Sequence, residues 1–224
     1  MDPARRVLII ACGALAHEIA ALRRLNGWST VDVRCLPPEL HNYPERIPAA
    51  VAAEIGAARG HYDGLFVAYA DCGTGGRLDA VLAAEGVERI PGAHCYEFFA
   101  TPAVFAALAE AEPGSFYLTD FLVRHFERLV AGTLGLDRHP ELVTEYFRNY
   151  HRVVYLAQLP NPELRAQAAA IAARLGLEFV ERSTGYGGLA DSLAGFTRRA
   201  GVSVVVEAQP AAPGPVTEQG PWPR

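Results

Sequence analysis

The chain has 224 residues and a mass of 24.1 kDa, and its 50% hydrophobic and 20% charged residues are typical of a folded protein with a sizeable core. All 20 basic residues are arginine, and the absence of lysine excludes a Schiff-base lysine, pyridoxal attachment and a phosphate-loop lysine. The net charge of -5 and the isoelectric point of about 5.8 disfavour nucleic acid as a partner.

Short apolar runs alternate with segments of helical periodicity along the chain. The runs predict strands at 7–12, 31–36, 64–73, near residue 90, and at 116–118, 152–158, 177–182 and 202–206. Helices are predicted at 15–22, 48–58, 78–84, 102–110, 121–134, 140–150, 162–175 and 189–199. Because helices follow strands throughout, we expect an α/β protein with a parallel, Rossmann-like three-layer sheet and crossover helices.

The domain organisation expected from this pattern is one α/β domain over residues 1–207 and a flexible, proline-rich tail over 208–224. The N-terminal apolar run is interrupted by His17 and Glu18 and is too short to cross a bilayer. A chain of this size does not need disulfides, and its cysteines form no CxxC pair. We therefore expect a cytoplasmic protein with reduced thiols and no membrane association.

Three of the four cysteines lie where predicted strands end. Cys12 ends the first strand, Cys72 follows the third, and Cys95 follows the short segment near residue 90. Because the carboxyl ends of parallel strands lie at one edge of the sheet, these thiols can converge and bind zinc or an iron–sulfur cluster with an open iron. The alternative for each is a buried, inert cysteine. Cys35 is assigned to a structural role.

Other candidate groups surround these cysteines. His94 precedes Cys95 and is a candidate ligand, Glu97 follows it as a candidate proton-transfer group, and His41 lies in a proline-flanked loop suited to ligation or catalysis. We expect Asp120 to cap the helix that follows it.

A glycine-rich turn after the third strand is a candidate anion site. Leu78 stands where a dinucleotide fingerprint needs Gly or Ala, so the turn does not match that motif. Its N–H groups and the following arginine predict contacts to a small anion, and a tight turn that needs no ligand is the alternative. The residues concerned are Gly73, Thr74, Gly75, Gly76 and Arg77.

A set of short motifs between about residues 7 and 196 resembles one family. The motifs are ACGAL, LPPELHNYP, DCGTGG, RIPGAHCYEFF, FYLTDFLVRHF, GLDRHPEL, RVVYLAQ and STGYG. In combination they resemble the bacterial and archaeal family called domain of unknown function 1638. The resemblance implies a single-domain cytoplasmic protein, often encoded beside corrinoid-dependent methyltransferases and corrinoid proteins of methylamine and betaine metabolism. It also implies a family pattern that contains Cys12, Cys72 and Cys95.

Residues and resemblance together predict a metal-binding enzyme of one-carbon or methylamine/betaine metabolism, either a methyltransferase or a lyase. Zinc is favoured over a 4Fe-4S cluster because a lone zinc ion needs no assembly machinery. The alternative is a non-enzymatic accessory protein of a corrinoid-dependent methyltransferase system. The expected partner is a small anionic or methylated metabolite, or a corrinoid protein. The predicted ligands are Cys12, Cys72, Cys95 and His94, and the predicted catalytic residues are His41 and Glu97.

Overall fold

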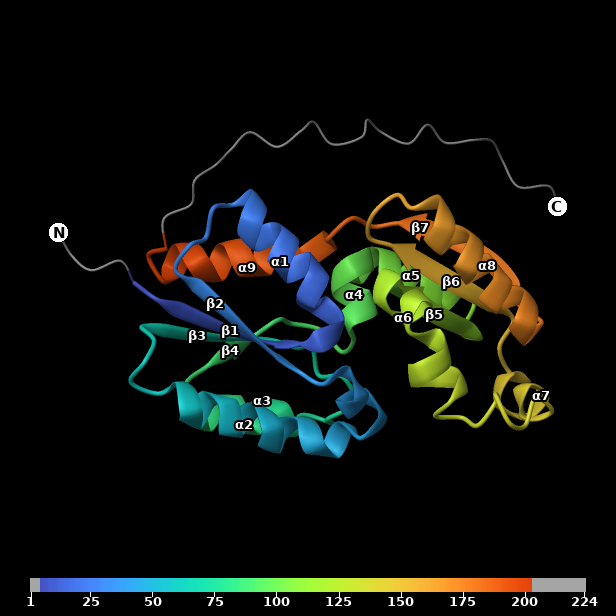
Figure 1. Cartoon of the computed structure of the whole chain (residues 1–224), viewed down its shortest axis with the longest axis horizontal. Coiled ribbons are helices and arrows are strands. Elements are labelled where there is room, and N and C mark those ends of the chain that lie inside the picture. Colours follow the sequence, from blue (N-terminus) through green and yellow to red (C-terminus); the bar gives the residue numbers. More distant parts are fainter. Residues whose placement is uncertain (1–4, 203–224) are drawn as a thin grey trace.

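A computed structural model describes residues 5–202, in which seven strands form two parallel sheets. The first sheet has the order β2-β1-β3-β4 and the second the order β5-β6-β7. Figure 1 shows the sheets side by side along the long axis of the molecule. The predicted parallel, Rossmann-like α/β architecture is therefore confirmed, with its strands divided between two sheets. The strands are β1 (Val7–Cys12), β2 (Val31–Leu36), β3 (Gly64–Ala68), β4 (Glu88–Arg89), β5 (Ser115–Thr119), β6 (Arg152–Ala157) and β7 (Glu178–Ser183).

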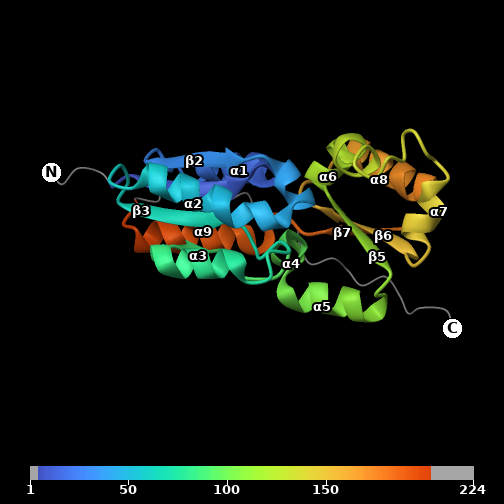
Figure 2. The same ribbon diagram turned by 90° about the horizontal axis from the view of Figure 1, so that it is seen from below.

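Helices cover both faces of each sheet, which gives three layers (Figures 1 and 2). Those around the first sheet are α1 (Ala16–Leu25), α2 (Ile47–Ala58), α3 (Arg77–Glu85) and α9 (Gly187–Arg199), with the 3-10 segments η1 (Gly13–Leu15), η2 (Pro38–Asn42) and η3 (Pro44–Arg46). Those around the second sheet are α4 (Cys95–Ala100), α5 (Pro102–Ala111), α6 (Asp120–Arg124), the π-helix η4 (Glu127–Ala131), α7 (Leu142–Phe147) and α8 (Pro162–Leu175).

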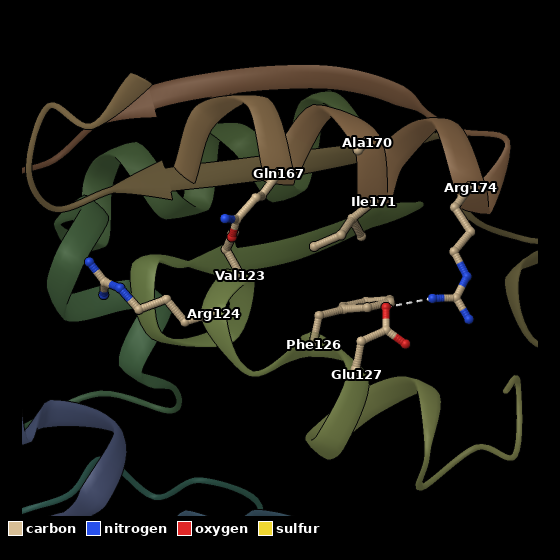
Figure 3. Close-up of a pocket in the computed structure, with 8 residues that line it drawn as sticks. All are labelled: Val123, Arg124, Phe126, Glu127, Gln167, Ala170, Ile171 and Arg174. Carbon is tan, nitrogen blue, oxygen red and sulfur yellow. Dashed lines mark hydrogen bonds and ion pairs between the residues drawn. The ribbon is translucent and has the colours of Figure 1, made fainter. Parts of the chain in front are cut away.

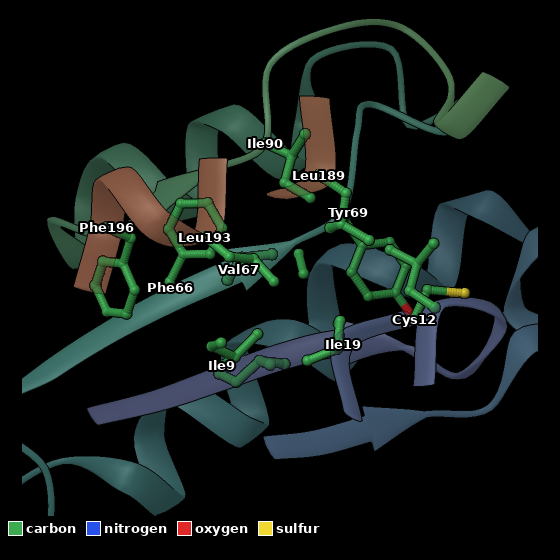
Figure 4. Packing of buried hydrophobic residues seen from close by; sticks show 14 of the residues in the cluster. Ile9, Cys12, Ile19, Phe66, Val67, Tyr69, Ile90, Leu189, Leu193 and Phe196 are labelled. Atoms are coloured by element: carbon green, nitrogen blue, oxygen red, sulfur yellow. The ribbon is translucent and has the colours of Figure 1, made fainter. Parts of the chain in front are cut away.

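The inner strands β1 and β6 are apolar, apart from Arg152 at the start of β6, because helices bury both of their faces. All six residues of β1 are buried, and β6 is buried from its second residue onward. On one face of the first sheet, the Phe66 ring of β3 stacks on the Phe196 ring of α9 with centroids 5.0 Å apart, and Leu193 lies beside them (Figure 4). The last helix thus returns from the second sheet and completes the core of the first.

The α9 return depends on a close backbone contact. Gly187, its first residue, has φ +47, and a Cβ there would collide with the carbonyl oxygens of Phe98 and Phe99 in α4. Only glycine allows this approach without a shift of the backbone. The start of α9 is therefore held against the end of α4, where the two sheets adjoin.

Two local predictions differ from the structure. The helix predicted over 121–134 is divided into α6 and η4, where the Gly132 N–H bonds the Glu127 carbonyl at 2.8 Å. Asp120 is not the cap of α6, because the Thr119 hydroxyl accepts from the Leu122 N–H at 3.3 Å. The buried Asp120 carboxylate instead accepts from the Tyr155 hydroxyl at 2.7 Å, which ties the start of α6 to β6.

Within residues 5–202, no helix combines the length and apolar character needed to cross a membrane. The predicted strand at 202–206, apart from its first residue, and the tail at 208–224 lie outside the described residues. The single domain over 1–207 stays a prediction.

Candidate functional site

Three cysteines and one histidine line an enclosed pocket at the carboxyl end of the first sheet. Cys12 is the last residue of β1, Cys72 follows β3, Cys95 begins α4, and His41 lies in η2. The pocket has a volume of about 10 Å³, which is room for a single water-sized atom or ion. The structure thus brings together the three thiols that the sequence singles out and adds His41 to them.

Cys12 and His41 face each other inside this pocket. The Cys12 Sγ accepts from the Ala14 N–H at 3.3 Å and lies 3.7 Å from the His41 Nδ1. The same nitrogen is 3.3 Å from the Pro38 carbonyl, and the imidazole stacks on the Tyr69 ring at 6.1 Å. The prolines of this loop and the Tyr69 ring therefore hold the imidazole against the sulfur.

Backbone hydrogen bonds bring Cys95 next to Cys72. The N–H groups of Asp71 and Cys72 bond the carbonyls of Gly92 and Ala93 at 3.0 and 2.9 Å. Cys72 has φ 50, a left-handed conformation that costs a residue with a side chain about 1–2 kcal/mol. Such strain persists where the surrounding structure fixes the geometry, as it does at many functional sites.

Burial keeps all four side chains uncharged when no cation is present. It raises the pKa of Cys12 to about 12, that of Cys72 to about 11, and that of Cys95 well above its usual value. Cys72 also raises the pKa of Cys12 and of Cys95, and Cys12 raises that of Cys95, because neighbouring thiolates would repel each other. Burial lowers the pKa of His41, so its imidazole is neutral and free to ligate.

Tyr69 supplies a further polar group to the pocket. Its side chain is 1% exposed, and its hydroxyl is buried without a hydrogen-bond partner within the usual distance. Burial raises its pKa, so the hydroxyl keeps its proton, and Figure 4 shows the ring beside Cys12. The hydroxyl is therefore available to donate to a Cys12 thiolate or to a bound group.

Three thiols and an imidazole are donors that suit a soft or borderline cation. Their arrangement in the structure is not that of a formed metal site. Across residues 5–202, no three His, Cys, Asp or Glu side chains lie in the arrangement of a formed metal site. Thiolates and neutral imidazole are the ligands that zinc takes in proteins. Metal binding would require the cysteine side chains to rotate toward the pocket centre.

His94 and Glu97 do not reach this pocket. His94 is exposed and lines a neighbouring cleft instead. The Glu97 carboxylate accepts from the Ala93 N–H at 2.8 Å, so it stabilises the loop before α4. The placement does not support His94 as a ligand or Glu97 as a catalytic group, and it leaves His41 as the histidine of the pocket.

The glycine-rich turn already has an internal acceptor. The Asp71 carboxylate accepts from the Thr74 hydroxyl at 2.6 Å and from the N–H groups of Gly75 and Gly76 at 3.1 and 2.9 Å. These hydrogen bonds lower the pKa of Asp71 to about 2. Arg77 is exposed and donates to the Thr74 carbonyl at 2.8 Å. The groups of Thr74 to Arg77 that were predicted to contact an anion therefore bond within the turn, which agrees with the alternative of a tight turn that needs no ligand. Of residues 73–77, only Gly73 lines the larger cleft described next.

A larger cleft adjoins the cysteine pocket between the two sheets. It has a volume of about 390 Å³ and shares His41, Cys72 and Cys95 with the pocket. The second sheet contributes residues from β5, α6 and η4. The lining residues are Ala14, Pro38, His41, Asn42, Pro44, Cys72, Gly73, His94, Cys95, Tyr96, Phe116, Thr119, Phe121, Leu122, Leu129 and Val130.

Two polar contacts join η2 to the second half of the molecule near this cleft. The Asn42 Nδ2 donates to the Thr133 hydroxyl at 3.1 Å, and Glu39 pairs with Arg128 of η4. Because η2 also carries His41, the same short segment lines the cysteine pocket and bridges the sheets.

An open groove between α8 and the α6–η4 segment has a different character (Figure 3). Its volume is about 330 Å³, and Arg174 pairs with Glu127 across it at 2.6 Å. It shares no lining residue with the cysteine pocket and contains neither cysteine nor histidine. We assign no chemistry to it.

Sequence reasoning missed Tyr69 and the residues of the second sheet. Tyr69 lies in the apolar run GLFVAYADC, where a hydroxyl within a buried segment is a signal for a polar partner. Thr119, Phe121 and Leu122 carry no comparable signal, because their place in the cleft depends on how the two sheets face each other.

Comparisons with known proteins give a family and no assigned activity. No curated protein matches the sequence. Among solved structures, the crystal structure of ornithine carbamoyltransferase from Gloeobacter violaceus is 14% identical, with a TM-score of 0.21. The match covers 79% of this chain and 55% of that one, and at this TM-score it carries no argument about function. The family model described as "Protein of unknown function (DUF1638)" matches residues 35–193, which include His41, Cys72 and Cys95 but not Cys12, and the chain belongs to that family.

Proposed function

We propose that this protein binds one zinc ion through Cys12, Cys72 and Cys95, with His41 as the fourth donor, and that it is an enzyme acting on a small molecule in the adjoining cleft. The observation that carries the proposal is the pocket of about 10 Å³ lined by three thiols and a half-buried imidazole. Three cysteines and one histidine are a common zinc ligand set.

The size of the pocket favours zinc over an iron–sulfur cluster. A 4Fe-4S cluster contains eight inorganic atoms, whereas a space of about 10 Å³ has room for a single ion. Accommodating a cluster would require the β1 end, the turn after β3 and the start of α4 to separate. A single zinc ion fits the space that is present.

The adjoining cleft gives the proposed metal site access to a substrate. A zinc ion bound there would lower the pKa of a substrate thiol or water, or polarise a substrate oxygen. With His41 as the fourth donor, a substrate atom would have to replace the imidazole on the zinc, and the released neutral imidazole would then accept a proton from the substrate. A methyltransferase or lyase of one-carbon or methylamine/betaine metabolism is the reaction class we propose, and this narrower part comes from the family resemblance.

Metal content of anaerobically purified protein tests the proposal. We expect about one zinc per chain and no visible absorbance. Zinc should be lost in Cys12→Ser, Cys72→Ser and Cys95→Ser, and weakened in His41→Ala. It should be retained in Cys35→Ser and His94→Ala, because Cys35 lies outside the pocket and His94 is exposed.

Two results would contradict this reading. Full zinc content in any of the three pocket cysteine variants removes that residue from the ligand set. Brown protein that contains iron and sulfide replaces zinc by the cluster.

A further inference from the structure

We infer that the cleft between the sheets binds an uncharged, mainly apolar small molecule. The inference rests on the proposed function, because it names the ligand class of the same site, and it restricts that function to uncharged substrates rather than charged methylamines or betaines. It concerns the cleft of about 390 Å³ rather than the enclosed cysteine pocket. That volume is within the range of roughly 300–1,000 Å³ that small-molecule sites occupy.

The cleft wall offers no permanent counter-charge to an ionic ligand. None of its lining residues is Arg, Lys, Asp or Glu, its imidazoles are those of the half-buried His41 and the exposed His94, and its largest side chains are Tyr96, Phe116 and Phe121. A carboxylate or phosphate enclosed there would lose its hydration without gaining an ion pair, at a cost of several kcal/mol. An apolar ligand loses little and gains contact with the aromatic and aliphatic walls.

Two arginines and two glycine N–H groups near the cleft already have partners. Arg128 pairs with Glu39, and Arg77 donates to the Thr74 carbonyl. The N–H groups of Gly75 and Gly76 bond the Asp71 carboxylate, which adds negative charge to that side of the cleft. An anion would therefore meet an occupied turn and a carboxylate.

The cleft also contains a few polar groups that can orient an uncharged ligand. The Thr119 hydroxyl accepts from the Leu122 N–H and still has its own proton to donate. Asn42 donates through Nδ2 to Thr133, so its carbonyl oxygen is available as an acceptor. Such sparse polar groups in an apolar wall are typical of small-molecule sites.

Thiol and hydroxyl groups lie at the inner end of the cleft, next to the cysteine pocket. They set the cleft apart from an empty space left between packed apolar side chains. The thiols of Cys72 and Cys95 line both the cleft and the enclosed pocket. The pocket also holds the Tyr69 hydroxyl, which is buried and has no hydrogen-bond partner within the usual distance. A ligand in the cleft would lie against these reactive groups.

A matched pair of fluorescent probes tests the ligand class. N-phenyl-1-naphthylamine is uncharged, and 8-anilinonaphthalene-1-sulfonate has the same ring systems with an added sulfonate. We expect the uncharged probe to bind with a dissociation constant at least about tenfold lower than that of the sulfonate probe. The sulfonate group would lose its hydration in the cleft without gaining an ion pair.

Substitutions in the wall localise the binding. Val130→Arg places a cation in the cleft at a partly exposed position and should reverse the preference. Leu122→Arg provides a second partly exposed wall position should the first variant fail to fold. Leu25→Arg, at an exposed leucine ending α1, is the matched control and should leave both affinities unchanged.

Equal or tighter binding of the sulfonate by the unmodified protein would overturn the inference, as would the absence of saturable binding of the uncharged probe. Zinc content is measured on the same samples. Preference for the uncharged probe in protein without zinc would sustain the ligand class while the proposed metal function fails. Bound zinc together with tighter binding of the sulfonate probe would sustain the proposed metal function, while the inferred ligand class fails.

Discussion

Asp71 is the residue that shapes the turn holding Cys72. Its carboxylate satisfies the Thr74 hydroxyl and two glycine N–H groups, while its own N–H bonds the Gly92 carbonyl. Asp71 thereby fixes, through its side chain and its backbone, the two segments that present Cys72 and Cys95 to the pocket. The motif DCGTGG thus forms an aspartate-centred turn rather than an anion cradle.

Replacing Asp71 by alanine should weaken both the turn and the metal site. The loss of charge-assisted hydrogen bonds at a partly exposed site predicts a fall of about 1–2 kcal/mol in the free energy of unfolding. Zinc retention should fall as well, because Cys72 is no longer held in its left-handed conformation. Urea unfolding and metal analysis measure the two effects. Asp191→Ala, at an exposed carboxylate on α9, is the control, and equal behaviour of the two variants would refute this role.

Glu18 is a buried carboxyl in α1 that makes the native state sensitive to pH. It is 5% exposed, and its Oε2 has no hydrogen-bond partner within the usual distance. Burial raises its pKa above the usual value of 4.5, and Asp120 raises it further, while His17 and Arg124 partly offset the shift. The native protein therefore favours the protonated form.

The sign of the pH dependence follows from this shift. The raised pKa contributes stability that is fully present below pH 4.5 and is lost as the pH rises through the native pKa. Glu18→Gln keeps the side chain neutral and should remove this loss, which makes the variant about 1–2 kcal/mol more stable than the unmodified protein at neutral pH. Urea unfolding across the acid-to-neutral range measures it. Stability curves that run parallel at every pH would contradict the prediction, and the exposed Glu178→Gln serves as the control.

At the scale of elements, the approach of α9 to α4 offers a matched pair of glycines. Gly185 and Gly187 both have positive φ, but a Cβ at Gly185 would meet no atom within 4 Å. Gly185→Ala should therefore lower the free energy of unfolding by only about 1 kcal/mol, which is the cost of placing a residue with a side chain at positive φ. Gly187→Ala adds a collision with α4 and should cost at least about 1–2 kcal/mol more. Equal free energies of unfolding in urea for the two variants would show that α9 does not need this close approach.

The secondary structure was largely predictable because β1, β3 and most of β6 are apolar runs, and β2 alternates between apolar and polar residues. β1 and β2 begin and end where the sequence predicts, and α8 extends over the predicted 162–175. α8 has strong local signals: the Asn161 side chain caps its start, and Gly176 ends it with φ 72. The division into two sheets was not predictable, because β4 has only two residues and nothing local prevents β5 from pairing with it.

The cysteines of the candidate site and a place for His41 near them were predictable, but the choice of His41 rather than His94 as the histidine of the pocket was not. Each of Cys12 and Cys72 follows an apolar strand, so the sheet itself places their thiols at one edge. Whether His41 or His94 joins them depends on the path of η2 after β2, and local sequence does not encode that path. The cleft wall from the second sheet was missed for the same reason.

At the scale of the whole molecule, η2 connects the pocket to the second sheet. No residue of η2 is buried, and the contacts of Asn42 with Thr133 and of Glu39 with Arg128 bridge the two halves. Exposed contacts of this kind each contribute less than about 1 kcal/mol. They hold the segment in place without dominating the stability of the fold.

Arg128→Ala should therefore loosen η2 while leaving the thermal midpoint almost unchanged. We expect faster hydrogen exchange in residues 38–46, because the segment loses a contact to η4 and has few buried groups of its own. Exchange is followed by mass spectrometry. Arg138→Ala, which removes an exposed arginine paired with its neighbour Asp137, is the control. Unchanged exchange in 38–46 would mean that the ion pair does not hold η2.

X-ray absorption at the zinc edge of the purified protein tests the three-cysteine site most directly, because it counts the donor atoms around the metal. The proposal predicts about three sulfur neighbours and one nitrogen neighbour, with one sulfur lost in any single Ser variant of Cys12, Cys72 or Cys95 that retains zinc. Zinc surrounded only by nitrogen and oxygen, or a spectrum unchanged in those variants, would contradict it.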